Sequence, residues 1–369
     1  MRPANNTAHH YIGIMSGTSL DGADALLVDL SQAKPQVKGF VSLPFAAPLR
    51  DELLALNRIG DNEIERSHLA ANALAHCYAR AVQQLLTTSG HSAADITAIG
   101  CHGQTVRHRP DRGYTVQLNN PALLAELCGI DIVADFRSRD VAAGGQGAPL
   151  VPAFHEGVFR VADETRVVVN IGGIANLTIL AADKPAWGFD CGPGNCLMDA
   201  WISQHQQKSH DAGGAWASQG RLLARLSSQL QGEPYFQQPP PKSTGRDDFN
   251  PAWLAARLAG NENPADVQAT LLHLSAWAIV DHMARYAPDA KRLLVCGGGA
   301  QNTALMAELT RQFTAGPVEA TDAEGVPAQQ VEALAFAWFA KQCVERHPLK
   351  ISTTTGARHD AVLGAIYPA

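Results

Sequence analysis

This sequence of 369 residues lacks the two commonest nucleotide-binding signatures. It contains no Gly-Lys dipeptide, which excludes a Gly-x4-Gly-Lys-Ser/Thr phosphate loop, and it has no Gly-x-Gly-x-x-Gly turn. Its seven cysteines form no Cys-x-x-Cys pair, and its histidines show no paired metal-ligand spacing. These absences argue against a structural metal and a disulfide framework, and they are typical of a protein in a reducing cytosol.

Long apolar runs and a surplus of basic charge are also absent. No uncharged apolar run approaches the roughly 20 residues that span a bilayer, and the first ten residues are polar, unlike a secretory signal. The formal net charge is −6, whereas a nucleic-acid surface needs a basic face. We therefore expect a cytoplasmic protein that has neither nucleic acid nor a membrane as a partner.

The length and composition of the chain fit two globular domains. Apolar residues make up 46% of the chain and charged residues 17%, which is enough to fill real cores. Strand-like and helix-like segments alternate in both halves, which predicts an α/β protein. We expect a tail at 1–10, an N-terminal lobe at 11–160 and a C-terminal lobe at 161–369, with a long Pro-rich excursion from the core near 208–250.

Three helices are predicted with definite ends. Apolar residues recur every fourth position over residues 65–88, and Gly90 follows as a stop. Pro264 opens a second helix that extends to about Tyr286. A strongly apolar stretch at 331–345 predicts a third.

The same device occurs twice, at residues 11–29 and 167–180. Each segment is an apolar strand, a turn rich in Gly, Ser, Thr or Asn, and a second apolar strand. Such turns let backbone N–H groups approach a phosphate closely. One copy alone is compatible with an ordinary hairpin. Two copies predict a polyphosphate, ATP, held between two related lobes.

Two further features fit a nucleotide. Asp21 and Asp24, in the first device, could orient Mg²⁺ through its water ligands. Gly297, Gly298 and Gly299 follow a buried strand at 292–296 and precede a helix, so an adenine could lie on bare backbone there. Crowding between the strand and the helix explains three glycines equally well.

Asp190 is the carboxylate with the most informative position. It follows an apolar strand at 187–190, and the strand is expected to break at 191–194. A rigidly held acid at such a strand end suits a general base. The alternative is a helix-capping aspartate, but Asn195 is better placed to cap the following helix. Among basic residues, Arg137, Arg139 and Arg246 could each bind a carboxylate or phosphate, although most arginines do not.

Seven segments in order resemble signatures of the anhydro-N-acetylmuramic acid kinase family. They are residues 13–24, 102–105, 145–150, 170–176, 189–195, 297–302 and 332–338, and the resemblance covers nearly the whole chain from Tyr11 on. One departure is Cys191, where Thr is expected more often. The resemblance implies two similar lobes of the actin/hexokinase (ribonuclease H-like) type with an ATP cleft between them, and a homodimer.

The resemblance also implies a reaction in peptidoglycan recycling. ATP, water and 1,6-anhydro-N-acetylmuramic acid, an amino sugar, give ADP and N-acetylmuramic acid 6-phosphate. The 6-oxygen of this sugar is locked in a bridge to the anomeric carbon, so no free hydroxyl exists there to deprotonate. Asp190 would instead take a proton from the water that attacks the anomeric carbon, as the base of an inverting glycosidase does.

Site residues follow from the two hairpins and the resemblance together. The ATP phosphates are assigned to Gly17, Thr18, Ser19, Leu20, Asp21, Gly22, Ala23 and Asp24 in the first hairpin and to Gly172, Gly173 and Asn176 in the second. The sugar is assigned to His102, Gln104, Arg137, Gly192, Asn195 and Glu332, and adenosine to Gly297, Gly298 and Gly299.

Two other functions are open on the residues alone. A conventional sugar kinase would use the same hairpins, with Asp190 deprotonating a free hydroxyl. A nucleotide-switched binding module would bind ATP without a small substrate, and Asp190 would then have no purpose.

Overall fold

The computed structural model describes residues 9–17 and 20–369, and it divides into two compact units. Unit 1 extends to Phe154 and resumes at Gln330, whereas unit 2 is His155–Gln329. The structure therefore differs from the expected lobe at 161–369, because residues 330–369 belong with unit 1. The cause is long-range packing: helix α11 (Val331–Val344) packs on strands β1 (His10–Met15) and β4 (Ile96–Cys101).

Unit 1 contains a six-stranded sheet in the order β13-β7-β4-β1-β2-β3. β1, β2 and β3 are antiparallel neighbours, β4 and β7 continue the sheet parallel to β1, and β13 is antiparallel to β7. Most of the expected tail at 1–10 lies outside the described residues, but His10 already begins β1. The other strands are β2 (Gly22–Asp29), β3 (Gln36–Pro44), β7 (Ile132–Ala134), β13 (Ala365–Tyr367) and a separate hairpin of β5 (Gln104–Arg109) and β6 (Tyr114–Leu118).

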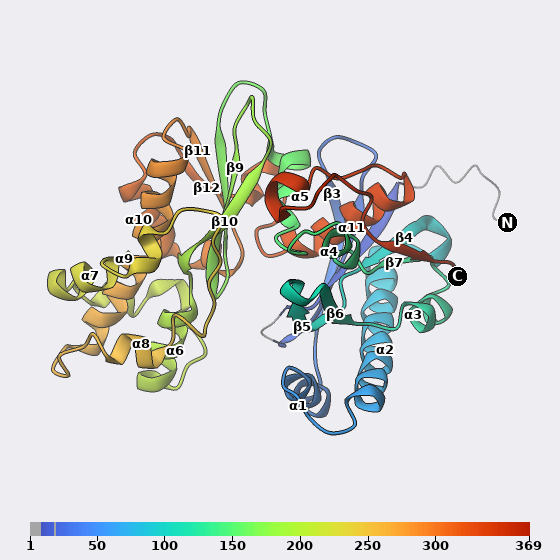
Figure 1. The fold of residues 1–369 in the computed structure, drawn as a ribbon, viewed down its shortest axis with the longest axis horizontal. Coiled ribbons are helices and arrows are strands. Elements are labelled where there is room, and N and C mark those ends of the chain that lie inside the picture. Colours follow the sequence, from blue (N-terminus) through green and yellow to red (C-terminus); the bar gives the residue numbers. More distant parts are fainter. Residues whose placement is uncertain (1–8, 18–19) are drawn as a thin grey trace. The chain divides into compact units, whose positions relative to one another are not determined.

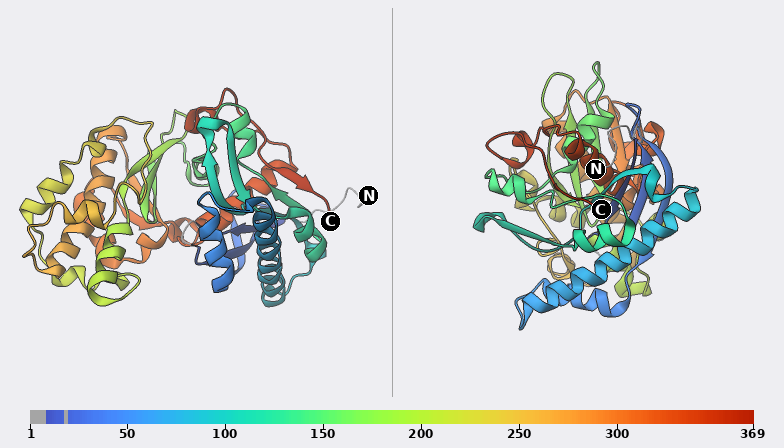
Figure 2. Two further views of the ribbon diagram at one scale, coloured as in Figure 1. Left: turned by 60° about the horizontal axis from the view of Figure 1, so that its bottom comes forward. Right: turned by 90° about the vertical axis from the view of Figure 1, so that its right-hand side faces the viewer.

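Helices cover both faces of this sheet (Figures 1 and 2). Ile12 and Ile14 of β1 point to one face, where they join a buried cluster with Tyr78 of α2 (Glu63–Ser89). Gly13 points to the other face, where a Cβ would lie 1.8 Å from the Ala333 carbonyl oxygen of α11. Bare backbone therefore lets α11 pack directly on the sheet. The remaining helices of unit 1 are α1 (Ala47–Leu56), α3 (Pro121–Cys128), α4 (Ser138–Ala142) and α12 (Ser352–Thr355), and α5 (Val151–Phe159) continues into unit 2.

Unit 2 repeats the strand order of unit 1. Its sheet is β10-β9-β8-β11-β12, with β8, β9 and β10 antiparallel neighbours and β11 and β12 parallel to β8. In both units the first five sheet strands along the chain thus lie in the order third, second, first, fourth, fifth. The α/β class and the repeated hairpin are confirmed. The strands are β8 (Arg166–Ile171), β9 (Ile174–Leu180), β10 (Trp187–Pro193), β11 (Arg292–Cys296) and β12 (Val318–Ala320).

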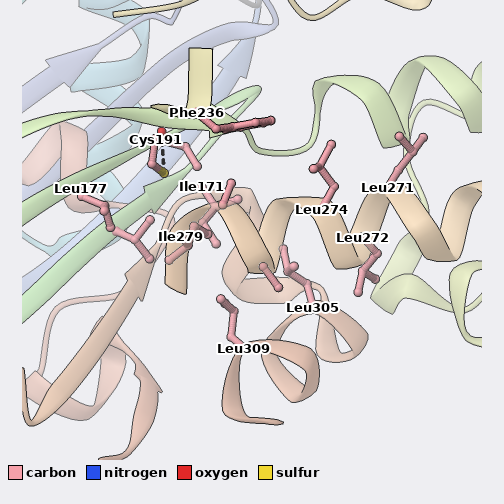
Figure 3. Packing of buried hydrophobic residues seen from close by; sticks show 14 of the residues in the cluster. Ile171, Leu177, Cys191, Phe236, Leu271, Leu272, Leu274, Ile279, Leu305 and Leu309 are labelled. Carbon is pink, nitrogen blue, oxygen red and sulfur yellow. Dashed lines mark hydrogen bonds between the residues drawn. The ribbon is translucent and has the colours of Figure 1, made fainter. Parts of the chain in front are cut away.

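The core of unit 2 lies between this sheet and its helices (Figure 3). Ile171 and Leu177 from the sheet pack with Leu274 and Ile279 of the long helix α9 (Pro264–Tyr286) and with Leu305 of α10 (Thr303–Gln312). The predicted start of α9 at Pro264 is confirmed, and the Asn263 side chain caps it by accepting the Ala265 N–H. The helices of unit 2 are α6 (Cys196–Gln206), α7 (Ala224–Gln231), α8 (Pro251–Ala255), α9 (Pro264–Tyr286) and α10 (Thr303–Gln312).

The segment 208–250 is not an excursion from the core. It contains α7 and several short turns of helix, and its side chains Tyr235, Phe236 and Phe249 are buried in the core of unit 2. The expectation of an excursion was wrong because it was based on the polar and Pro-rich composition, whereas three aromatic side chains hold the segment in the core. Each of these residues buries a large aromatic side chain in this core.

Candidate active site

In unit 1 the candidate site gathers where two parallel strands end. β1 and β4 are parallel neighbours, so the chain leaves both at the same sheet edge after Met15 and Cys101. The Gln104 side-chain amide donates to the Gly17 carbonyl oxygen at 3.2 Å, which ties the two strand exits together. A pocket of about 290 Å³ opens there, lined by Met15, Gly17, Asp21, Gly22, Asp24, Ser42, Pro44 and Glu332.

Two of the lining carboxylates differ in burial. Asp21 is exposed, whereas Asp24 is partly buried on β2 beside Ser42 of β3. Burial raises the pKa of Asp24, the Ser42 hydroxyl hydrogen bond opposes this, and the nearby Asp21 charge adds to it. Two neighbouring carboxylates in one pocket repel each other, and a bound cation would relieve this repulsion.

The pocket fits a magnesium ion held through water. Among the described residues, no group of three or more His, Cys, Asp or Glu side chains is placed to hold a metal ion directly. Mg²⁺ keeps several of its waters and needs few protein ligands. Asp21 and Asp24 supply the carboxylate oxygens that such waters would contact, so the donor set matches outer-sphere binding.

A buried polar cluster lies beside this pocket. Arg137 donates from Nε to His102 Nε2 at 3.1 Å and from a second nitrogen to the Gly147 carbonyl oxygen at 2.7 Å. Burial lowers the pKa of His102 well below its usual value, and the Arg137 charge acts in the same direction. The imidazole is therefore neutral, with its proton on Nδ1.

Two atoms of this cluster point to a ligand. Within the described part of the chain, His102 Nδ1 and Gln104 Oε1 are buried and have no hydrogen-bond partner. Buried polar atoms are nearly always paired in proteins. One unpaired donor and one unpaired acceptor beside the pocket could be satisfied by a polar ligand, and they make this cluster a candidate binding site.

Arg137 and Glu332 complete the polar side of unit 1. Burial lowers the pKa of Arg137 to about 10, and the charges of Glu332 and Asp140 oppose this change. Glu332 lies in the first turn of α11 and is exposed to the pocket. Because α11 packs across β1 and β4, its first turn lies beside the ends of these strands, where the pocket is.

Three residues assigned to the first phosphate turn, Leu20, Gly22 and Ala23, are explained by the packing of the fold. Leu20 is 2% exposed and adopts a left-handed φ of 58°, and Ala23 is fully buried. At Gly22 a Cβ would lie 2.2 Å from the Leu43 carbonyl oxygen, so strand packing requires glycine. Only the backbone of these three residues is available to a ligand. Thr18 and Ser19 lie outside the described residues.

In unit 2 three sequence motifs converge on the turn between β8 and β9. Asn195 donates its backbone N–H to the Gly172 carbonyl oxygen at 2.8 Å and its side-chain amide to the Ile171 carbonyl oxygen at 3.2 Å. A Cβ on Gly298 would lie 3.6 Å from that same amide nitrogen. The turn, the start of α6 and the glycine run after β11 thus form one surface.

Asn195 does not cap α6 with its side chain, contrary to the sequence interpretation. It occupies the N-cap position, but its amide is turned toward Ile171. The strand also does not break at 191–194, because β10 continues through Pro193 with a register shift between Asp190 and Gly192. Such bulges re-aim side chains beside active sites.

The glycines of this surface fall into two kinds. Gly297 has a φ of 79°, and Gly299 is packed so closely on Ile171 that a Cβ would lie 2.4 Å from its side chain. Crowding, the alternative raised for the glycine run, therefore explains these two. The nearest atoms to a Cβ on Gly172 or Gly298 are 3.7 and 3.6 Å away. Nothing in the packing of the described residues requires glycine there, so a ligand could approach the backbone of both closely.

Asp190 lies on β10, partly buried, opposite Asn176 of β9. Its carboxylate accepts the Thr244 N–H at 3.1 Å, and its backbone carbonyl accepts the Tyr235 hydroxyl at 2.6 Å. Burial raises its pKa, and the Thr244 hydrogen bond opposes this. Gly192 next to it is buried against Phe236, where a Cβ would lie 2.7 Å from the ring, so the core accounts for that glycine.

Sequence reasoning missed Thr244 and Tyr235 as neighbours of Asp190. Both are more than 40 residues away along the chain, in the segment expected to leave the core. No periodicity marks them. The adjacent Pro239–Pro241 cluster suggested a loop, and loops carry function when a rigid scaffold holds them.

Two α/β units with one strand order, each with a glycine-containing turn after its first strand, define the actin/hexokinase (ribonuclease H-like) fold class. The fold is similar to that of component A of the (R)-2-hydroxyglutaryl-CoA dehydratase of Acidaminococcus fermentans. The TM-score is 0.50 at 12% identity, with 89% of this chain and 96% of the other covered.

The chain belongs to the anhydro-N-acetylmuramic acid kinase family, whose profile matches residues 9–369. It is similar to the anhydro-N-acetylmuramic acid kinases of Bordetella pertussis (57% identical, covering 97% of this chain and 96% of the relative) and Cupriavidus metallidurans (54%, covering both fully). It is therefore a kinase, a phosphotransferase to an alcohol group. No helix among the described residues is long and apolar enough to cross a membrane.

Proposed function

We propose that this protein uses ATP and water to convert 1,6-anhydro-N-acetylmuramic acid into N-acetylmuramic acid 6-phosphate, with Asp190 as the general base. The observation that carries the proposal is the environment of Asp190. It is a partly buried carboxylate with a raised pKa, held by Thr244 on a strand that ends beside a glycine turn. Family membership supplies the substrate.

The chemistry of the substrate explains why such a base is needed. Water attacks the anomeric carbon as its bond to the 6-oxygen breaks, and Asp190 takes one proton of that water. The released 6-oxygen forms a bond to the γ-phosphorus of ATP as the bond to ADP breaks. The water oxygen becomes the anomeric hydroxyl, and the proton passes from Asp190 to solvent.

The glycine turns supply the phosphate contacts in this proposal. The backbone of Gly17 through Asp24 would line the phosphates in the first turn, where the Leu20 N–H already donates to the Gly17 carbonyl oxygen. In the second turn the Gly172 N–H already donates to the Ile174 carbonyl oxygen at 3.2 Å, so Gly173 would donate its N–H group to a phosphate oxygen and Gly172 would only allow close approach. Gly298 would lie against the adenosine because its Cα is uncovered, with Gly297 and Gly299 shaping the turn around it. Asn176, opposite Asp190 in register, would contact the transferred phosphate. Asp21 and Asp24 would hold Mg²⁺ through its waters, and the ion would neutralise phosphate charge.

The sugar would be bound mainly by the polar cluster of unit 1. His102 Nδ1 is a buried donor and Gln104 Oε1 a buried acceptor, and a sugar hydroxyl or N-acetyl group satisfies both kinds of atom. Arg137 and Glu332 would add one charge of each sign at the pocket. Asn195 borders the turn of unit 2, whereas Gly192 would contribute only backbone atoms.

The biological role in this proposal is the recycling of cell-wall peptidoglycan. A homodimer and a cytoplasmic location belong to the same proposal. Size-exclusion chromatography with light scattering tests the dimer independently of the chemistry.

Product analysis in heavy-oxygen water tests the reaction. The enzyme is incubated with ATP, Mg²⁺ and 1,6-anhydro-N-acetylmuramic acid, and the products are examined by mass spectrometry. We expect one heavy oxygen at the anomeric hydroxyl and none in the 6-phosphate. Heavy oxygen found only in inorganic phosphate would indicate plain ATP hydrolysis. Faster turnover of open N-acetylmuramic acid would indicate a conventional sugar kinase instead.

A further inference from the structure

The loop at residues 242–246 contacts both Asp190 and the glycine turn of unit 2, yet the proposed function uses only one of its backbone N–H groups. Its sequence is Lys-Ser-Thr-Gly-Arg. It follows the Pro-rich stretch and precedes Phe249, which is anchored in the core.

Lys242 fixes the start of this loop. Its ammonium group donates to the Tyr235 carbonyl oxygen at 3.0 Å and to His282 Nε2 at 2.7 Å, and it lies 4.4 Å from the centre of the Tyr235 ring. His282 donates from Nδ1 to the Ala278 carbonyl oxygen at 2.6 Å, so its Nε2 is free to accept. These contacts hold the start of the loop to α9 through His282 and to the turn at Pro234–Gln237 through Tyr235.

The anchored segment surrounds the backbone and side chain of Asp190. The Asp190 N–H donates to the Lys242 carbonyl oxygen at 3.3 Å, and the Asp190 carbonyl accepts the Tyr235 hydroxyl at 2.6 Å. The Thr244 N–H then reaches the carboxylate at 3.1 Å. Because β10 is the edge strand of its sheet, these bonds replace the missing neighbour strand and orient the base.

Arg246, two residues further on, lies over the glycine turn. A Cβ on Gly173 would be 3.2 Å from both Nε and a terminal nitrogen of the guanidinium. The side chain is exposed and, among the described residues, forms no hydrogen bond or salt bridge. Asp199 and Cys196 of α6 are the titratable groups that sense its charge. A planar cation with unused donors beside a bare turn suits an anionic oxygen.

We propose that the 242–246 loop is part of the catalytic apparatus, with Lys242 as a positioning residue for Asp190 and Arg246 as the residue that binds an anionic oxygen of a reactant beside Gly173. The inference rests on the proposed function. Two reactants carry such oxygens, the nucleotide in its phosphates and the sugar in its lactyl carboxylate, and the recognition chemistry is the same.

Substitution of Arg246 tests the anion site. We expect Arg246→Gln to weaken binding of one reactant by about 10- to 100-fold, the range for a charged hydrogen bond. Arg246→Lys should restore part of this. Calorimetric titration with ADP and, separately, with the anhydro sugar measures each affinity without turnover. Arg225→Gln is the matched control, because Arg225 is an exposed arginine of unit 2 paired with Glu262, and its affinities should equal those of the wild type.

A sugar without the carboxylate separates the two sources. With 1,6-anhydro-N-acetylglucosamine as substrate, a carboxylate-binding Arg246 predicts that Arg246→Gln has the same kcat/KM as the wild type. A phosphate-binding Arg246 predicts that Arg246→Gln loses kcat/KM by the same factor with both sugars. Either result supports the anion site, whereas wild-type affinities for ADP and for the natural sugar together with a wild-type kcat/KM for ATP would overturn it.

Substitution of Lys242 tests the positioning role. We expect Lys242→Met to lower kcat by about 10- to 100-fold, the cost of a misplaced catalytic group, with little change in KM for ATP. The acid limb of the pH–kcat profile should move upward, because a weakened Thr244 hydrogen bond raises the pKa of Asp190. The charged or titratable groups around Lys242, Thr244 and Asp190 include Tyr235, His282, Arg285, Asp281, Cys191 and Asp248.

A second variant guards against simple misfolding. Tyr235→Phe removes only the hydroxyl that donates to Asp190 and should lower kcat in the same way, while Lys208→Met, at an exposed lysine of unit 2, should not. An unmoved acid limb together with wild-type kcat in both Lys242→Met and Tyr235→Phe would overturn the positioning role. If the wild type itself does not phosphorylate the anhydro sugar, the proposed function fails instead.

Discussion

Units 1 and 2 have the same strand order but equip the same positions differently. After its fourth sheet strand, unit 1 carries His102 and Gln104, whereas unit 2 carries Gly297 to Gly299 after β11. After the first strand, unit 1 leads to Asp21 and Asp24, whereas unit 2 leads to Gly172, Gly173 and Asn176, an uncharged residue at the third position of β9 as Asp24 is of β2. At these positions unit 1 therefore offers charged and buried polar side chains and unit 2 mainly backbone, to which Asp190, Asn176 and the loop at 242–246 add side chains.

The glycines show the same division. In unit 1, Gly13 and Gly100 lie inside strands where a Cβ would strike the backbone of α11 at 1.8 and 2.0 Å. In unit 2, Gly172 and Gly298 lie in turns with no atom closer than about 3.6 Å to a Cβ. Glycine thus serves helix packing at Gly13 and Gly100 of unit 1 and leaves an open surface at Gly172 and Gly298 of unit 2. The comparison can be tested by making like changes in both units.

The largest effect is expected at the carboxylate that breaks the pattern. Asp190→Asn should lower kcat by about 100- to 10,000-fold, the usual contribution of a general base. ADP affinity and Tm should change little, because the amide keeps the shape and can still accept the Thr244 N–H. Steady-state kinetics, calorimetry and a melting curve measure the three. Near-normal turnover would refute the assigned role.

A methyl group inside the sheet of unit 1 comes next. Gly100→Ala should destabilise the protein by about 1–3 kcal/mol or more, because the new Cβ would lie 2.0 Å from the Phe336 carbonyl oxygen. Urea denaturation measures this. An unchanged midpoint would show that α11 can shift without cost.

The same substitution in unit 2 should have the opposite profile. Gly298→Ala should leave the urea midpoint unchanged but raise KM for ATP roughly tenfold, equivalent to about 1.4 kcal/mol of lost binding. The methyl group meets only the Asn195 amide at 3.6 Å, so any loss comes from the ligand. A lower urea midpoint with an unchanged KM would show that Gly298, like Gly100, is required by packing and not by a ligand.

Substitution of Asp24 in unit 1 should change the Mg²⁺ dependence of activity, because this residue is expected to hold the ion and not to act as a base. Asp24→Asn should raise the Mg²⁺ concentration for half-maximal activity about tenfold, as expected when an outer-shell ligand is lost. Activity is titrated with Mg²⁺ at fixed ATP. Asp51→Asn, at an exposed aspartate of the same unit, is the control and should leave the titration unchanged. A loss of kcat that excess Mg²⁺ does not restore would contradict the assignment.

The smallest effect concerns Asp199 in unit 2, whose pKa burial raises to about 6. Because the folded pKa lies above the unfolded value, the folded state binds more protons, and this group lowers stability as pH rises from about 4 to 6. Asp199→Asn should therefore raise Tm by about 2–4 °C at pH 7.5 and change it little at pH 4. A rise of the same size at both pH values would point to packing instead of charge.

Much of the fold was predictable because hairpins and helices are local. The pairs of apolar runs around a turn rich in Gly, Ser, Thr or Asn at 11–29 and 167–180 predicted β1–β2 and β8–β9, and Pro264 predicted the start of α9. The candidate site was predicted in part. Asp190 and the turns were identified, because each has a strand before it and glycine beside it.

Sequence by itself determined the α/β class, the two hairpins and family membership, since these depend on short-range periodicity and on ordered motifs. Only the tertiary structure decided that α11 belongs with unit 1, that Tyr235 and Thr244 hold Asp190, and that Gly172 and Gly298 are uncovered while Gly297 and Gly299 are packed. These features depend on contacts between residues far apart in the chain. Such contacts form where buried apolar surface and satisfied hydrogen bonds are greatest, and no local pattern records them.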